Sequence, residues 1–110
     1  MIKEFPINVH YFAGKNIVFS GGGFFRFFPY PLIKYWGRQT EYMMTYFHPR
    51  DFDVGQPVVK SLPLIRKFKS YVGIAGAFKK WQQFLSDFEF VNVEQADGMI
   101  DWDSQRVVNL

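Results

Sequence analysis

The expected order of elements follows from residues 16–29, which read Asn-Ile-Val-Phe-Ser-Gly-Gly-Gly-Phe-Phe-Arg-Phe-Phe-Pro. Three of the first four residues, Ile17, Val18 and Phe19, are apolar and two of them are β-branched, which is typical of a strand, and the three glycines after Ser20 indicate a tight turn. Pro29 and Pro31 suit the first turn of a helix, and the sequence predicts that this helix runs to about Arg38. The expected order is strand, glycine loop, helix.

Three further stretches have the composition of strands. The clearest is residues 42–47, which are rich in Tyr, Met, Thr and Phe and are ended by Pro49. Shorter candidates lie at residues 2–5 and 88–93. Because side chains alternate along a strand, His48 is expected to share a face with Tyr46.

Residues 75–87 predict an amphipathic helix, because apolar side chains recur at spacings of three and four residues with lysines and glutamines between them. Residues 62–71 leave two alternatives open, a short helix or an irregular basic connector. Parallel strands need crossover connections, so alternating strands and helices predict an α/β fold. We expect a small, mostly parallel sheet with two main helices, and such a sheet leaves an open edge.

Composition and charge exclude several classes of function. The chain has 110 residues and no cysteine, so one domain is expected, without disulfides, thiolate nucleophiles or iron–sulfur clusters. No signal peptide and no apolar run of the roughly 20 residues needed to span a membrane is visible, which predicts a cytoplasmic chain with no membrane partner. The net charge is +3 with bases concentrated in residues 60–80. A solvated face is the commoner meaning, so no nucleic-acid partner is expected.

The glycine run does not match a nucleotide-binding motif. Phe and Arg follow it, instead of the Lys-Ser or Lys-Thr pair of a phosphate-binding loop, and Arg26 stands where the dinucleotide pattern needs a glycine. The run therefore predicts a turn whose backbone approaches another segment closely, as glycine permits. No spacing of histidines or carboxylates predicts a metal cage in this chain.

Arg26 and His48 are the candidate functional residues. Arg26 lies among four phenylalanines, where a guanidinium usually has a carboxylate partner, although an exposed arginine beside an apolar cluster is the alternative. His48 ends an expected strand, where α/β enzymes place their chemistry, although a structural role is commoner. Asp51 and Asp53 are expected in a turn, with a smaller chance that one of them orients His48.

Three blocks in order carry a resemblance: residues 4–6 (Glu-Phe-Pro), residues 21–30 (Gly-Gly-Gly-Phe-Phe-Arg-Phe-Phe-Pro-Tyr) and residues 46–53 (Tyr-Phe-His-Pro-Arg-Asp-Phe-Asp). Together they resemble the C-terminal region of polysaccharide deacetylases linked to exopolysaccharide loci, in the nodulation-type superfamily. The resemblance covers about residues 1–94 and leaves residues 95–110 as a polar tail. Members commonly have Trp and Glu where this chain has Arg50 and Asp51.

The resemblance implies the C-terminal portion of a distorted (β/α) barrel. Family members are hydrolases of carbohydrate metabolism that remove the acetyl group of an N-acetyl sugar. They use a divalent metal, zinc or similar, whose ligands belong to N-terminal motifs that this chain lacks. In this chain the resemblance implies that His48 gives a proton to the departing amine, that Arg26 steadies the base, and that Phe24, Phe25 and Tyr46 bind substrate.

Two functions follow as alternatives. The first is the C-terminal part of a metal-dependent polysaccharide deacetylase, inactive alone and paired with an N-terminal deacetylase segment. The second is a non-catalytic binding or assembly module that pairs with a partner chain or with itself. The exposed apolar surface of an unpaired sheet is expected in either case.

Overall fold

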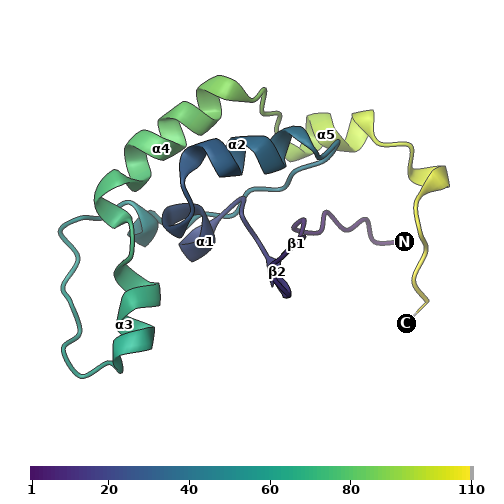
Figure 1. Cartoon of the computed structure of the whole chain (residues 1–110). Coiled ribbons are helices and arrows are strands. Elements are labelled where there is room, and N and C mark those ends of the chain that lie inside the picture. Colours follow the sequence, from purple (N-terminus) through teal and green to yellow (C-terminus); the bar gives the residue numbers. More distant parts are fainter. Residues whose placement is uncertain (110) are drawn as a thin grey trace.

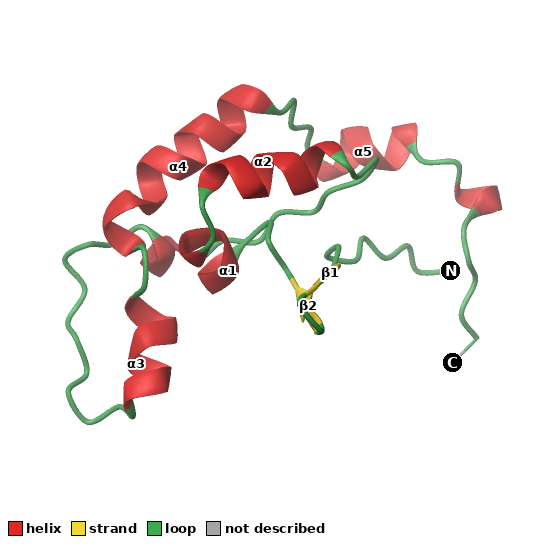
Figure 2. Cartoon of the chain, viewed as in Figure 1, coloured by secondary structure: helices red, strands yellow, loops and turns green. Residues whose placement is uncertain are grey.

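The computed structural model describes residues 1–109 and is mostly helical (Figures 1 and 2). In chain order, its elements are β1 (His10–Phe12), β2 (Lys15–Ile17), α1 (Gly22–Phe27), α2 (Tyr30–Arg38), the 3-10 helix η1 (Pro49–Asp51), α3 (Leu64–Tyr71), α4 (Ile74–Asp87), α5 (Val93–Met99) and the 3-10 helix η2 (Trp102–Ser104). Within residues 1–109, no helix combines the length and the apolar composition needed to cross a membrane.

The predicted α/β fold, a portion of a (β/α) barrel with a mostly parallel sheet, is wrong. The sheet within residues 1–109 is a hairpin of two antiparallel strands, β1 and β2. Residues 2–5 and 88–92 form no strand, and residues 42–47 are extended but pair only through one isolated parallel bridge between Gly21 and Tyr46. The composition of these stretches favours an extended backbone, but a strand also needs a neighbouring strand.

Side chains replace the missing neighbour along residues 42–47. The Ser20 hydroxyl donates to the Met44 carbonyl at 2.7 Å, and the Asn8 side-chain oxygen accepts the Met44 N–H at 3.2 Å. Backbone groups that are removed from water need partners, and here they find them without a sheet. The extended segment is therefore stable in this position although it is not a strand.

Two of the expected helices are confirmed as α2 and α4, and residues 62–71 adopt the helical alternative as α3. Sequence reasoning missed α1 and α5. The signal for α5 was a capping box, because the Asn92 side chain accepts the Gln95 N–H at 2.8 Å and the Gln95 side chain accepts the Asn92 N–H at 3.1 Å.

The turn of the hairpin between β1 and β2 was also missed. Ala13 and Gly14 have φ angles of 50° and 77°, which suits the tight turn of a two-residue hairpin.

The core lies where α1 and α2 pack against α4 (Figure 1). Phe25 of α1 is fully buried, and its ring centroid lies 4.9 Å from that of Phe47 and 5.3 Å from that of Phe84 in α4. The Tyr30 hydroxyl of α2 donates to an Asp87 carboxylate oxygen at 2.6 Å, at the end of α4. Aromatic packing and this polar contact together fix α2 against α4.

The chain buries less of itself than a self-contained domain of its size. Its accessible surface is 8626 Å², against about 6,300 Å² expected for a monomeric protein of 13.0 kDa. The Cα radius of gyration is 16.2 Å, against about 13 Å expected for a compact chain of this length. Neither α3 nor α5 contains a buried residue. Much apolar surface therefore remains uncovered in the described part of the chain.

The predicted close approach at the glycine run is confirmed at Gly21. A Cβ atom there would overlap the carbonyl oxygen of Tyr46, across the isolated bridge.

We expect Gly21→Ala to lower the free energy of unfolding by about 1–3 kcal/mol, because the extended segment must move away. Gly76→Ala is the matched control. A Cβ at Gly76, inside α4, meets no atom within 4 Å, so this variant should gain about 0.5–1 kcal/mol in chemical denaturation. Equal stability of the two variants would contradict the close approach.

The contact between α2 and α4 predicts a measurable shift in acidity. The hydrogen bond from Tyr30, followed by contacts from Lys34, holds the pKa of Asp87 below its usual value. Tyr30→Phe should raise the pKa of Asp87 in an NMR titration of the carboxyl carbons, whereas Tyr35→Phe on the exposed side of α2 should leave it unchanged. Because a lowered pKa stabilises the fold above the unfolded pKa of Asp, the stability difference between Tyr30→Phe and the parent should shrink as the pH falls through the pKa of folded Asp87. An unchanged pKa would contradict the contact.

Candidate functional site

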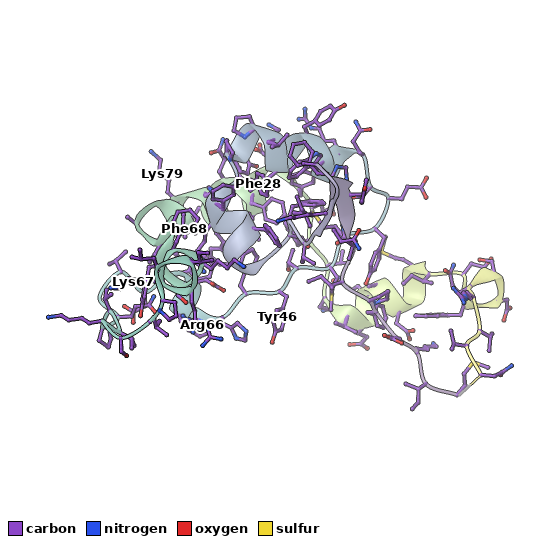
Figure 3. The ribbon with its side chains drawn as sticks, turned by 60° about the horizontal axis from the view of Figure 1, so that its bottom comes forward. Phe28, Tyr46, Arg66, Lys67, Phe68 and Lys79 are labelled. Carbon is purple, nitrogen blue, oxygen red and sulfur yellow. The ribbon has the colours of Figure 1, made fainter. Side chains whose placement is uncertain are left out.

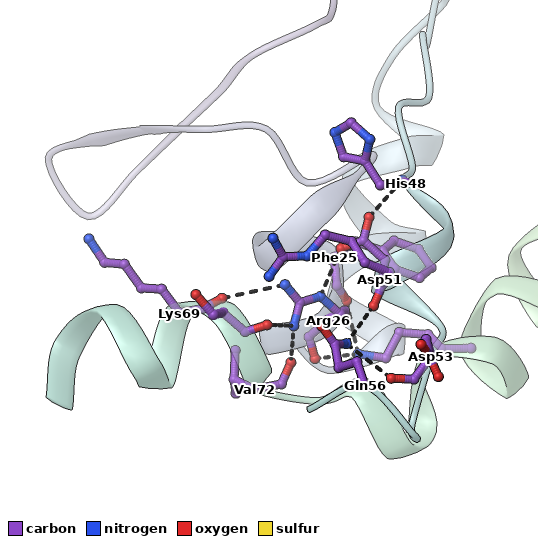
Figure 4. Close-up of polar contacts among 11 residues, drawn as sticks. Phe25, Arg26, His48, Asp51, Asp53, Gln56, Lys69 and Val72 are labelled. Carbon is purple, nitrogen blue, oxygen red and sulfur yellow. Dashed lines mark hydrogen bonds and ion pairs between the residues drawn. The ribbon is translucent and has the colours of Figure 1, made fainter. Parts of the chain in front are cut away.

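Arg26, Asp51 and His48 meet where α1, η1 and α3 converge (Figure 4). Arg26 Nε lies 3.2 Å from Asp51 Oδ1, and each side chain is only 5% exposed. The carboxylate partner predicted from the apolar surroundings of Arg26 is therefore confirmed. Arg26 Nε is buried without a hydrogen bond of suitable geometry, so this contact is an ion pair.

The other end of the Arg26 guanidinium binds the last turn of α3. Nη1 donates to the carbonyls of Val72 at 2.8 Å and Ser70 at 3.2 Å, and Nη2 donates to the carbonyl of Lys69 at 3.4 Å. The last carbonyls of a helix have no partner within the helix, and a cation near this end also complements the helix dipole. Arg26 thus caps α3 and holds it against α1.

Asp51 connects Arg26 to His48. Its second oxygen, Oδ2, accepts the backbone N–H of His48 at 2.8 Å, and the Asp51 N–H donates to the His48 carbonyl at 2.9 Å. Sequence reasoning placed Asp51 in a turn and gave it only a smaller chance of orienting His48. The structure shows a buried residue that fixes the backbone of His48. Asp53 is the exposed turn residue that was expected, and it accepts the Gly55 N–H at 2.9 Å.

The His48 side chain is exposed, and Figure 4 shows its ring pointing away from Asp51. The ring centroid lies 4.8 Å from that of Tyr46 in an edge-to-face contact, as expected for residues on the same side of an extended segment. Tyr46 is 60% exposed. The imidazole is therefore open to a bound molecule while its backbone is held rigidly.

The residues expected to bind substrate lie in different environments. Phe25 is fully buried in the core, so in this conformation it offers no surface to a ligand. Phe24 is 41% exposed and stacks on Phe28 at 6.1 Å, in a ring cluster that continues through Phe27 to Phe68 of α3. Only Phe24 and Tyr46 of the three present their rings to a ligand.

The site's own residues do not fit the divalent metal that the resemblance implies. Both oxygens of Asp51, the carboxylate beside His48, are engaged by Arg26 and by the His48 backbone. Among residues 1–109, no group of three or more metal-ligating side chains converges. Of the three residues at this junction, His48 is the one whose side chain is exposed.

Lys80 of α4 is a partly buried cation that sequence reasoning missed. Its Nζ donates to the carbonyls of Phe25, Arg26 and Phe28 at 2.8–3.0 Å and so caps α1, and burial lowers its pKa. Gly73 has a φ of 71° and lies so close to the Arg26 carbonyl that a Cβ atom at this position would overlap it. A lysine within a predicted basic face gives no sequence signal for this role.

The ion pair predicts a large effect at Asp51. Asp51→Asn leaves the buried Arg26 guanidinium without a countercharge, so the free energy of unfolding should fall by about 3 kcal/mol. Asp53→Asn removes an equal charge from the same loop at an exposed position and should cost less than about 1 kcal/mol. Urea denaturation of both variants measures the difference. Similar losses would show that Asp51 acts only as another turn residue.

Comparison with known proteins gives one match. The model of a protein family described as "Domain of unknown function (DUF3473)" matches residues 1–97. No curated protein and no solved structure matches the chain. The matched residues contain Arg26, His48 and Asp51, together with every element from β1 to α4.

Proposed function

We propose that the chain, which belongs to the DUF3473 family of domains of unknown function, is the C-terminal part of a metal-dependent polysaccharide deacetylase. The observation that carries the proposal is the Arg26–Asp51 ion pair of 3.2 Å. It joins the glycine–aromatic–arginine block to the Tyr-Phe-His-Pro block, the two most specific parts of the resemblance. Their contact supports one shared site that ends at the exposed His48.

In this proposal His48 is the general acid that protonates the departing amine of the sugar. A positioned general acid typically contributes about 10² to 10⁴ in rate. Arg26 is a positioning residue, because its side chain is only 5% exposed and its guanidinium binds carbonyls and a carboxylate of the chain itself. It fixes η1 through Asp51 and so fixes the place of His48.

An N-terminal deacetylase segment is the proposed partner, and it would supply the metal and the nucleophilic water. The exposed apolar face of α3 supports a missing neighbour, since Leu64 is 84% exposed, Ile65 72% and Phe68 55%. Exposed apolar patches of this kind mark interaction surfaces. The excess accessible surface of the whole chain supports the same conclusion.

A non-catalytic assembly module is the second candidate. The same face of α3 favours it, because an apolar surface can bind a partner chain or a second copy without any chemistry at His48. The two candidates differ in what an N-terminal companion does. A catalytic segment gains activity from the companion, whereas an assembly module gains none.

The test is acetate release from an N-acetylglucosamine oligomer with zinc or cobalt present. We expect no release by the chain alone, and release when it is mixed with the N-terminal half of a related deacetylase. In the mixture, His48→Ala should lower turnover about 10²-fold or more without changing metal content. His10→Gln removes the other imidazole, which packs against Trp36, and serves as the control.

Each other result has a definite meaning. Release by the chain alone would contradict the proposed need for a partner. Unchanged turnover in His48→Ala would remove His48 from the mechanism. Absence of acetate release by the mixture, together with self-association of the chain in light scattering, would favour the assembly module.

A further inference from the structure

A shallow depression of 520 Å³ lies between α3 and the loop that follows η1. The residues that carry its chemistry are Arg50, Gln56, Val59, Arg66, Ser70 and Tyr71. Arg66 and Ser70 are four residues apart and share one side of α3, away from the apolar residues Leu64 and Phe68.

Two arginines without a carboxylate partner line this depression. The ion pairs within residues 1–109 use Lys3, Arg26 and Lys34, so neither Arg50 nor Arg66 takes part in one. No acidic side chain lines the depression, and residues 54–86 contain no Asp or Glu. A guanidinium presents a planar fork that matches a carboxylate with two parallel hydrogen bonds. The depression therefore suits an anion from outside the chain.

Hydrogen bonds fix the walls of the depression. The Tyr71 hydroxyl of α3 accepts the Val59 N–H at 3.0 Å and donates to the Pro57 carbonyl at 3.3 Å. The Gln56 side chain donates to the Arg50 carbonyl at 2.8 Å, which ties the loop to η1. A site whose walls are held before binding loses less entropy when a ligand arrives.

The depression adjoins the proposed catalytic site through η1. Arg50 lies in η1, directly before Asp51, which fixes the His48 backbone. Figure 3 shows Arg66 and Tyr46 projecting from the same edge of the molecule. The Ser70 carbonyl, from a residue that lines the depression, accepts from Arg26. A polymer that reaches His48 therefore has a basic depression beside it.

We infer that this depression binds the carboxylate of an acidic sugar, and that the polymer which the chain recognises is an anionic polysaccharide containing uronate residues. The sugar nature of the ligand rests on the proposed function. The binding of an anion rests on Arg50 and Arg66 alone. The two parts can therefore fail separately.

The test is calorimetric titration of the full chain with three probes: a hyaluronan octasaccharide, which alternates glucuronate with N-acetylglucosamine, a neutral N-acetylglucosamine hexamer, and polyphosphate. We expect the hyaluronan fragment to bind at least about tenfold more tightly than either other probe, and more weakly as salt rises. Arg50→Gln and Arg66→Gln should each weaken its binding about tenfold, because each removes a charge-assisted contact. Lys79→Gln removes one exposed positive charge outside the depression and should leave binding unchanged.

Four results would overturn the inference. They are failure of the hyaluronan fragment to bind, preference for the neutral hexamer, equal binding of polyphosphate, and equal weakening by Lys79→Gln, the last of which would indicate attraction to general positive charge. Circular dichroism of each variant separates lost binding from lost folding. Acetate release in the reconstituted enzyme is measured independently, so preference for the neutral hexamer would overturn the anionic site and leave the proposed deacetylase intact.

Discussion

The junction of α1, η1 and α3 depends on the burial of one positive charge, the guanidinium of Arg26. A charge removed from water among phenylalanine rings is stable only when it is paired and hydrogen-bonded. Arg26 meets this requirement with a carboxylate from η1 and three carbonyls at the end of α3. One side chain on α1 therefore holds together segments more than 40 residues apart along the chain. Lys80 completes the arrangement from the other side, where it satisfies the carbonyls at the end of α1.

This arrangement explains how an exposed histidine can have a defined position. α3 has no buried residue, so apolar packing within the chain contributes little to its place, and polar contacts from Arg26 and Tyr71 hold it instead. Asp51 transmits the same constraint to the backbone of His48. The result is a rigid polar junction beside a large uncovered apolar surface. Such a combination suits a chain whose site is completed by a partner.

Sequence reasoning succeeded where a local pattern has a local cause. Pro29 and Pro31 predicted α2, the spacing of apolar residues predicted α4, and the glycine run predicted the close backbone approach at Gly21. It failed for residues 42–47, because extended composition does not reveal that Ser20 and Asn8 would satisfy the backbone in place of a strand. The carboxylate partner of Arg26 was expected, but its identity was not, since Asp51 lies 25 residues away and resembles any turn aspartate. Contacts between distant residues leave little trace in a single sequence.

Hydrogen exchange of the Arg26→Gln variant tests most directly whether Arg26 positions α3. In this variant we expect the amides at the end of α3, residues 68–72, to lose protection, while those of α2 and α4 keep most of theirs, since the core around Phe25 and Phe84 does not use the guanidinium. Unchanged exchange in α3 would contradict this role, because α3 would then be held by something other than Arg26. Equal loss of protection in all helices would also contradict it, since Arg26 would then support the core rather than α3.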